Sequence, residues 1–388
     1  METILQEVFI LLLMILISPV IARFLRVPVV VAEIIIGIVI GPSFLNLLHE
    51  SAWLLFMSMI GFIYLMFIVG LEVELSYVKE SLFKVVAISL GSFLTPFALG
   101  YLIGVYFNIS PSFIGLALST TSMGVILPTV KEFSSKKEVA QVILGAAILV
   151  DIISMFALMY IVEQTYLTLD KVFLIMILLL ALIAAAELVK ACKSLRTRIV
   201  KSLESHHLDV KLSLTTIFGL SVFAEYVGIH AIIGSFFAGL LISELEDKVE
   251  GLLEKLLSFG YGFFIPTFFI TVGIRTNLKY LISGVGELEL LIALLAAGFM
   301  GKILGTSIPA KILGFNKYES LSMGFAMNAR LSLIIAAAEL GVATGIIGPE
   351  TYSTFILLAV ISVIASPFLA KICIGKSPIV IPKEIPIP

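Results

Sequence analysis

The chain has 388 residues, of which 60% are hydrophobic and only 13% are charged, and its formal net charge is −2. Soluble globular proteins carry about 25% charged residues, so this chain has too few to cover the surface of a water-soluble fold of its size. The composition therefore predicts an integral membrane protein, and the small net charge argues against a nucleic acid as partner.

The N-terminal segment lacks the pattern of a cleavable signal peptide. It begins with Met-Glu-Thr-Ile-Leu-Gln-Glu and contains no early Lys or Arg, whereas signal peptides start with a basic region and end at a small-residue cleavage site. We therefore expect residues 5–23 to form the first membrane helix.

Apolar runs long enough to cross a bilayer, about 20 residues each, recur along the whole chain. They predict an all-α polytopic membrane protein with about thirteen transmembrane helices. The expected spans are 5–23, 27–43, 52–70, 83–107, 111–130, 138–163, 171–191, 211–226, 229–244, 255–275, 285–312, 318–341 and 351–373. A break between the two short neighbours near Gly228 is favoured by the polar Glu225.

The distribution of basic residues predicts how the chain lies in the membrane. With the N-terminus outside, 20 Lys and Arg residues fall in cytoplasmic segments and three in outside segments, while Lys302 and Arg330 lie inside spans, which accounts for all 25. Cytoplasmic loops are enriched in Lys and Arg. We therefore expect a multi-pass cell-membrane protein with its N-terminus outside and its C-terminus in the cytoplasm.

Two pairs of spans resemble each other at nearly constant spacing. The second span contains AEIIIGIVIG from Ala32, and the ninth contains GSFFAGLLIS from Gly234. The third and tenth spans both contain a Val-Gly pair, ending at Gly70 and Gly273, just before the polar residues that follow the span. Seven spans separate the members of each pair, so the two halves are expected to lie upside down relative to each other. Such inverted repeats are frequent in secondary transporters, whose substrate sites lie near the bilayer midplane.

Asp151 lies at the middle of the sixth span, with about 18–20 Å of helix on either side. A charge at this depth is costly, and no residue on the same helix can neutralise it. Carboxylate oxygens suit hard cations, and burial disfavours the ionised form, so a proton and a cation can compete for this group. An ion pair with a basic residue on another span is the structural alternative.

Six other charged positions lie inside predicted spans or near their ends. Lys302 is either a second proton carrier or a fixed counter-ion to Asp151, and Arg330, which stays protonated, is expected to have a structural role. Glu33 lies roughly 9 Å into the second span and is expected to pair with a basic residue of another span or to face a cavity, whereas Glu339 is expected to reach the interface. Glu187 and Glu225, which also lie near helix ends, are likewise expected to reach the interface.

Polar residues interrupt two spans that correspond in the repeat. The fifth span contains the run Ser119–Ser122 followed by Gly124 and Pro128, and the twelfth contains Asn328-Ala329-Arg330 at a similar depth. Broken helices at matching positions indicate an ion site, because the helix ends offer amides and carbonyls to the ion. We expect Thr121, Ser122 and Asn328 to line this site, although Ser/Thr back-bonding in continuous helices is the alternative.

Several segments together resemble the monovalent cation:proton antiporters, and most closely the branch of the Kef-type and Nap-type exchangers. They are VPVVVAEIIIGIVIGPSFL from Val27, FIVGLEVEL from Phe67, STTSMGVILPTVKE from Ser119 and FFIPTFFITVGIRTNL from Phe263. The resemblance implies a thirteen-helix fold with a dimer domain, a mobile core domain and two crossed broken helices. It also implies a homodimer.

By this resemblance, Asp151 is the essential ion-binding aspartate, Lys302 the basic residue that faces it and Arg330 the arginine of the twelfth span. Two positions depart from the family pattern. Val150 replaces the usual Asp, Asn or Gln before the essential aspartate, and Leu331-Ser332 replace the Gly-Glu that often follows the arginine. Both changes remove polar groups from the site and leave ion choice and stoichiometry open.

We therefore expect residues 1–388 to form one transporter unit, without the C-terminal nucleotide-binding domain of Kef-type relatives, since no Gly-x-Gly-x-x-Gly occurs. The expected function is Na⁺/H⁺ antiport, with K⁺/H⁺ antiport or a cation channel of the same fold as alternatives. The protein is not expected to be an enzyme or to need a cofactor, because Na⁺ and H⁺ are its cargo. An intramembrane aspartyl protease needs a second central Asp, and a retinal protein fits thirteen spans poorly.

Overall fold

The computed structural model describes residues 2–71, 81–131, 137–162, 208–227, 230–246, 252–279 and 285–376, and within these ranges the protein is all-helical. The predicted all-α membrane fold is confirmed: eight of the described helices are long and apolar enough to cross a bilayer, and shorter apolar helices accompany them. The expected span 171–191 lies outside the described residues, as does Glu187.

The helices follow the expected spans closely, and each described boundary lies within three residues of its expected position. The helices are α1 (Glu2–Leu25), α2 (Val29–Ile40), α3 (Ala52–Leu71), α5 (Leu82–Phe107), α6 (Pro111–Ser119), α7 (Met123–Lys131), α8 (Lys137–Val162), α11 (Leu208–Val227), α12 (Ala231–Glu246), α13 (Leu252–Phe259), α14 (Ile265–Arg275), α16 (Val285–Ile312), α17 (Lys317–Met327), α18 (Ser332–Ala343) and α19 (Pro349–Ile374). The break expected near Gly228 agrees with the end of α11 at Val227 and the start of α12 at Ala231, while Gly228 itself lies outside the described residues.

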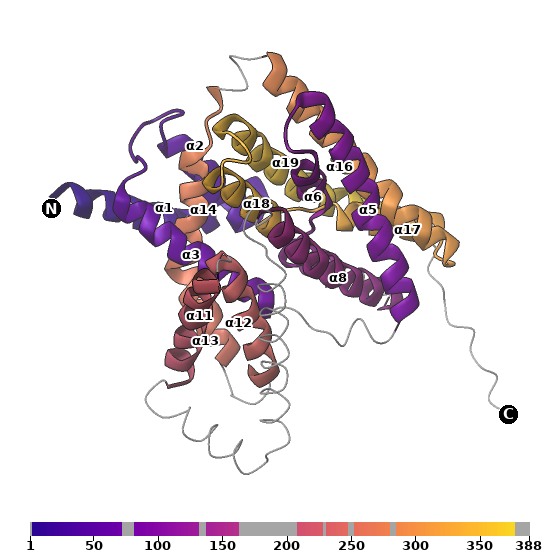
Figure 1. Ribbon diagram of the computed structural model, residues 1–388, viewed down its shortest axis with the longest axis horizontal. Helices are drawn as coiled ribbons and strands as arrows, with labels where there is room; N and C mark the ends of the chain where they lie inside the picture. Colours follow the sequence, from indigo (N-terminus) through magenta and orange to yellow (C-terminus); the bar gives the residue numbers. More distant parts are fainter. Residues whose placement is uncertain are drawn as a thin grey trace, which may run out of the picture.

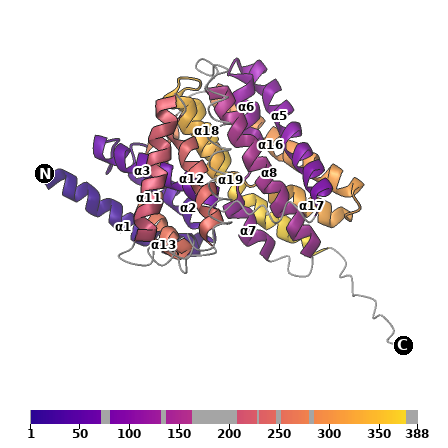
Figure 2. The same cartoon turned by 60° about the horizontal axis from the view of Figure 1, so that its bottom comes forward.

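The helices pack into two bundles that lie side by side (Figures 1 and 2). In one, here called the scaffold bundle, α14 packs on α2 and α3, α12 packs on α3 and α11, and α1 packs on α2. In the other, the core bundle, α5 packs on α6, α8 and α16, and α17 packs on α16 and α19. The bundles meet where α18 contacts α3 and where α19 contacts α14.

Two close helix crossings in the scaffold bundle depend on glycine. A Cβ atom at Gly37 would lie 2.0 Å from the Ile270 carbonyl oxygen and 2.9 Å from the Gly273 Cα, and one at Gly239 would lie 2.1 Å from the Phe67 carbonyl oxygen and 2.9 Å from the Gly70 carbonyl carbon. Small residues allow membrane helices to approach this closely. Each crossing therefore joins one helix from the first half of the chain to one from the second.

These crossings match the repeat that the sequence predicts. The aligned segments place Gly37 opposite Gly239 and Gly70 opposite Gly273. If each glycine is replaced by its counterpart in the other half, the contact between Gly37 and Gly273 therefore becomes the contact between Gly239 and Gly70. A chance similarity between apolar helices would not produce this exchange of contacts.

The tenth span differs from a regular α-helix, which the sequence did not predict. Between α13 and α14 the residues Gly260–Phe264 form a π-helical turn. Pro266 follows in the first turn of α14, and a proline removes a backbone donor and crowds the preceding turn. The hydroxyl of Tyr64 on α3 donates to the Leu256 carbonyl oxygen across 2.9 Å, which ties this irregular helix to α3.

Two interrupted helices lie in the core bundle, where the sequence predicts them. The fifth span ends its first half at Ser119 and resumes at Met123, and the twelfth ends its first half at Met327 and resumes at Ser332. The halves cross, because α6 contacts α18 while α7 contacts α17. Two helix C-termini and two helix N-termini therefore meet in the interior of the bundle.

Candidate functional site: a buried carboxylate between two interrupted helices

Asp151 lies on α8 beside the interruption between α6 and α7. Its side chain is buried, with an exposed fraction of 4%. The Thr121 hydroxyl donates to Asp151 Oδ1 across 3.1 Å, and the backbone amide of Met123, the first residue of α7, adds to the stabilisation of the ionised carboxylate. The N-terminus of a helix favours a negative charge, so α7 helps to stabilise an ionised Asp151.

Lys302 on α16 is fully buried, but it does not form an ion pair with Asp151 within 4 Å. Its ammonium group donates to the Ser119 carbonyl oxygen at 2.6 Å and to the Ser92 hydroxyl at 3.2 Å. Ser119 is the last residue of α6. The C-terminal carbonyl of α6 therefore binds the ammonium group, and the influence of Lys302 on Asp151 is electrostatic.

Arg330, in the interruption of the twelfth span, is also fully buried. Its guanidinium donates to the Leu118 carbonyl oxygen at 2.9 Å and to the Gly298 carbonyl oxygen at 2.8 Å, and it donates to the Asn328 carbonyl oxygen at 3.1 Å and to Asn328 Oδ1 at 2.8 Å. These contacts connect both interruptions to α16. The geometry fits the structural role that we expect for this residue.

The two basic groups and the carboxylate lie at opposite ends of the interruption in the fifth span. Lys302 and Arg330 both bind carbonyl oxygens from the last turn of α6, where the helix dipole is negative, whereas Asp151 lies at the start of α7, where it is positive. Each buried charge is thereby stabilised by a helix end. This leaves Asp151 without a basic side chain in direct contact among the residues that the structure describes.

Asn328 lies in the second interruption as predicted, but its side chain has structural partners. Its Oδ1 accepts from Arg330, and its Nδ2 donates to the Ser366 hydroxyl on α19 across 2.9 Å. No hydrogen bond joins Asn328 to Asp151. The sequence predicted the interruption correctly, but it did not indicate that the side-chain amide of Asn328 would be hydrogen-bonded to Arg330 and Ser366.

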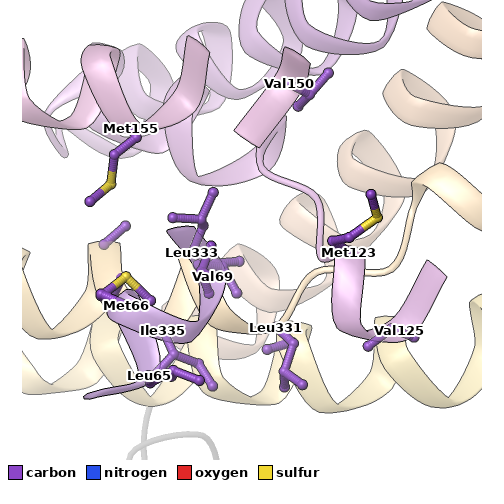
Figure 3. Packing of buried hydrophobic residues seen from close by; sticks show 14 of the residues in the cluster. Leu65, Met66, Val69, Met123, Val125, Val150, Met155, Leu331, Leu333 and Ile335 are labelled. Carbon is purple, nitrogen blue, oxygen red and sulfur yellow. The ribbon is translucent and has the colours of Figure 1, made fainter. Parts of the chain in front are cut away.

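A cavity of about 510 Å³ lies between the two bundles and reaches this region. Ser122, the neighbour of Thr121, lines it together with Val69 of α3 and Leu331 of the second interruption. Figure 3 shows apolar side chains from both bundles gathered there, with Val69, Val125 and Leu331 among them. The cavity also extends to Arg26 and Lys371, which are exposed near one end of the bundles.

The remaining predicted carboxylate, Glu33, lies outside this site. It is buried on α2 as expected, with an exposed fraction of 3%, and Ser18 on α1 donates to its Oε1 across 3.3 Å. No cluster of three His, Cys, Asp or Glu side chains occurs among the described residues. The oxygen donors suited to a cation are therefore Asp151 and the hydroxyls and backbone groups of the first interruption.

Sequence reasoning missed two hydroxyls that belong to this region. The hydroxyl of Ser92 accepts a hydrogen bond from the Lys302 ammonium group. Ser154, one helical turn beyond Asp151, is buried and its hydroxyl has no partner in the part of the chain that the structure describes. The spacing of Ser154 three residues after Asp151 was the available signal, since residues three apart share a helix face.

Comparison with known proteins places the chain in a family. The family model described as "Sodium/hydrogen exchanger, transmembrane" matches residues 9–371. A protein of Methanocaldococcus jannaschii named "Probable Na(+)/H(+) antiporter 3" is 32% identical, over 96% of this chain and 97% of its own. The "Na(+)/H(+)-K(+) antiporter GerN" of Bacillus cereus is 28% identical, over 90% of each chain.

A solved structure shows the same fold. The sodium proton antiporter MjNhaP1 from Methanocaldococcus jannaschii aligns with a TM-score of 0.62 over 96% of this chain and 99% of its own, at 14% identity. The interrupted helices, the buried aspartate and the family match agree with the resemblance that the sequence predicts. The chain belongs to the sodium/hydrogen exchanger family of transmembrane transporters.

Proposed function

We propose that this protein is a secondary active transporter that exchanges a monovalent cation, with Na⁺ as the leading candidate, for protons across the cell membrane. The observation that carries the proposal is the environment of Asp151, which is buried beside a broken helix, hydrogen-bonded to Thr121 and not ion-paired within 4 Å among the described residues. The Na⁺/H⁺ antiporters among its relatives, named as such, support the choice of ion.

The proposed cycle requires Asp151 to bind either a proton or a cation at any one time. An empty, ionised carboxylate in this interior is costly, so occupancy by either ion favours movement of the core bundle relative to the scaffold bundle. Because the cavity beside Ser122 lies between the bundles, such a movement changes the side from which the site is reached. Alternation between two access states then couples the two fluxes.

Lys302 decides the stoichiometry of this exchange. An ammonium that releases a proton in every cycle would make the exchange electrogenic, whereas a fixed charge would give one proton for one cation. We propose the fixed charge, because the ammonium of Lys302 is hydrogen-bonded to the Ser119 carbonyl oxygen at the C-terminus of α6 rather than to Asp151. A positive charge is stabilised at that helix end.

The decisive experiment is a proteoliposome assay that follows proton movement when Na⁺ is added under an imposed pH gradient. Asp151→Asn should abolish the coupled flux, and Asp151→Glu should retain part of it because the carboxylate remains. Glu138→Gln is the matched control on the same helix, since Glu138 pairs with Lys84 at an exposed end of α8. Full exchange by Asp151→Asn would refute the proposal.

The same assay distinguishes the alternatives. K⁺/H⁺ antiport, which the printed name of GerN also includes, predicts a proton flux with K⁺ that equals or exceeds the flux with Na⁺ or Li⁺. A channel predicts cation flux that does not saturate and does not depend on the pH gradient. Exchange by alternating access predicts saturation and strict dependence on a proton countercurrent.

We also propose an orientation and an assembly. The excess of basic residues supports an outside N-terminus and a cytoplasmic C-terminus, so that the cavity near Arg26 and Lys371 faces the cytoplasm. A homodimer formed through the scaffold bundle is proposed from the family resemblance. Exposed apolar side chains along α1, such as Phe9 and Leu16, offer such a surface.

A further inference from the structure

The two ends of the boundary between the bundles differ. At one end, the cavity separates α19 from the scaffold bundle near Lys371. At the other end, Tyr352 in the first turn of α19 touches the scaffold bundle through Arg275 at the end of α14. These two residues of α19 are separated by nineteen positions, or about 28 Å of helix, so the boundary is open at one end and closed at the other.

A group of charged and aromatic side chains forms the closed end. Arg275 Nη1 pairs with Glu339 Oε2 on α18, and the guanidinium carbon lies 5.2 Å from the centre of the Tyr352 ring. The Tyr352 hydroxyl donates to Glu339 Oε1 across 2.6 Å, and Arg275 Nε lies 3.5 Å from Glu50 Oε2. We call Arg275, Glu50, Glu339 and Tyr352 the outer latch.

The outer latch connects the two bundles. Arg275 and Glu50 belong to the scaffold bundle and the segment that follows α2, whereas Glu339 and Tyr352 belong to the core bundle. Of the ion pairs formed between residues that the structure describes, the pair of Arg275 and Glu339 is the one that joins the bundles. The backbone amide of Asn277 also donates to the Ser353 hydroxyl of α19 across 3.1 Å.

The outer latch is also linked to the ion site through α18. This half-helix begins at Ser332, directly after the interruption that contains Arg330, and carries Glu339 two turns later. A displacement of the second interruption would therefore move Glu339 relative to Arg275. Glu339 lies near the end of its span, where its carboxylate pairs with Arg275 and accepts a hydrogen bond from Tyr352.

We infer that the outer latch closes the outside entrance to the ion site and must open once in every transport cycle. The inference rests on the proposed alternating-access exchange and adds to it the residues that set the equilibrium between the two access states. Removal of the latch should shift this equilibrium toward the state that is open to the outside, because only the closed state contains the ion pair and the hydrogen bond.

A cysteine reporter tests this shift without any transport measurement. Ile335 is fully buried and lies four residues before Glu339 on α18, so it faces the same side one turn deeper. Ile335→Cys, in a chain carrying Cys192→Ser and Cys373→Ser, should react slowly with a membrane-impermeant maleimide added outside. Adding Glu339→Gln should raise the rate about three- to tenfold, the range expected for a partly exposed ion pair with one hydrogen bond.

Matched variants exclude a general loosening of the fold. Tyr352→Phe removes only the hydroxyl bond to Glu339 and should raise the labelling rate by a smaller factor. Glu350→Gln removes a carboxylate from the same end of α19 without touching Arg275 and should leave the rate unchanged. The exchanged pair Arg275→Glu with Glu339→Arg should return the rate toward the original value, whereas equal rates in Glu339→Gln and its parent would overturn the inference.

A second measurement asks whether the latch must open. In the same cysteine-free background, Arg275→Cys with Glu339→Cys can be bridged by a short, reducible bifunctional thiol reagent. Bridging should stop exchange, and reduction should restore it, while Arg275→Cys alone should be unaffected by the reagent. Undiminished exchange by the bridged protein would refute the latch, whereas an absence of exchange in the unmodified parent, with labelling that still responds to Glu339→Gln, would refute the proposed function and leave the latch standing.

Discussion

Thr121 donates its hydroxyl to Oδ1 of Asp151 across 3.1 Å, so the interruption of the fifth span contacts the carboxylate directly. A hydroxyl can also offer its oxygen to a cation, whereas a methyl group cannot. Thr121→Val should therefore weaken the apparent affinity for Na⁺ about tenfold, which corresponds to a loss of about 1.4 kcal/mol. Sodium titrations of exchange in proteoliposomes measure this change.

Thr121→Ser is the matched control for that substitution, because it keeps the hydroxyl and removes only the methyl group. Its affinity should remain within about twofold of the parent. If the Val and Ser variants were equally impaired, packing rather than the hydroxyl would be responsible.

The position of Lys302 predicts electroneutral exchange. Its ammonium is bound to the end of α6, and in the fixed-charge exchange proposed above Asp151 alone trades a proton for a cation. An imposed membrane potential of either sign should leave the exchange rate unchanged in proteoliposomes under a constant pH gradient. A rate that rises with an inside-negative potential and becomes insensitive in Lys302→Gln would identify Lys302 as a proton carrier instead.

Arg330→Lys should destabilise the protein although the charge is retained. One ammonium group cannot reach the carbonyl oxygens of Leu118, Gly298 and Asn328 together, and a buried acceptor without a partner costs about 1–3 kcal/mol. Thermal unfolding in detergent should show a lower midpoint. Arg23→Lys, at an exposed position of α1, should leave the midpoint unchanged.

Gly37→Ala should separate α2 from α14. The added methyl group would lie 2.0 Å from the Ile270 carbonyl oxygen, so the helices must move apart; overpacking of this kind costs about 1–3 kcal/mol. The unfolding midpoint should therefore fall. Gly219→Ala is the control, since nothing lies within 4 Å of the added group on α11, and it should be neutral or slightly stabilising.

The sequence predicts the helices of this protein well because a bilayer requires a long apolar run for each crossing. It also predicts both interruptions, since Ser119–Ser122 and Asn328–Arg330 are polar at mid-depth. It did not predict which side chain each buried charge contacts. Lys302 binds the end of α6 rather than Asp151. Which partner it contacts depends on how the helices are rotated and packed, and the periodicity of apolar residues does not predict this packing.

The outer latch was missed for a related reason. Arg275 and Glu339 both lie near span ends, where a charged residue normally reaches water, and they are 64 positions apart in the chain. Their contact follows only from the way α14 and α18 meet at the boundary of the bundles. The π-helical turn at Gly260–Phe264 was likewise not predicted, because the residues of this turn continue the apolar run of the span.

The glycine crossings have a consequence for how the chain is inserted into the membrane. Gly37 and Gly70 enter the bilayer with the first three helices, but their partners Gly273 and Gly239 are synthesised about 170–240 residues later. At the elongation rate of about 5–20 residues per second, the early helices wait on the order of ten seconds or more with lipid against their small-residue faces. The scaffold bundle therefore reaches its final packing only after most of the second half has been synthesised, and a truncated first half would expose these faces to other membrane proteins.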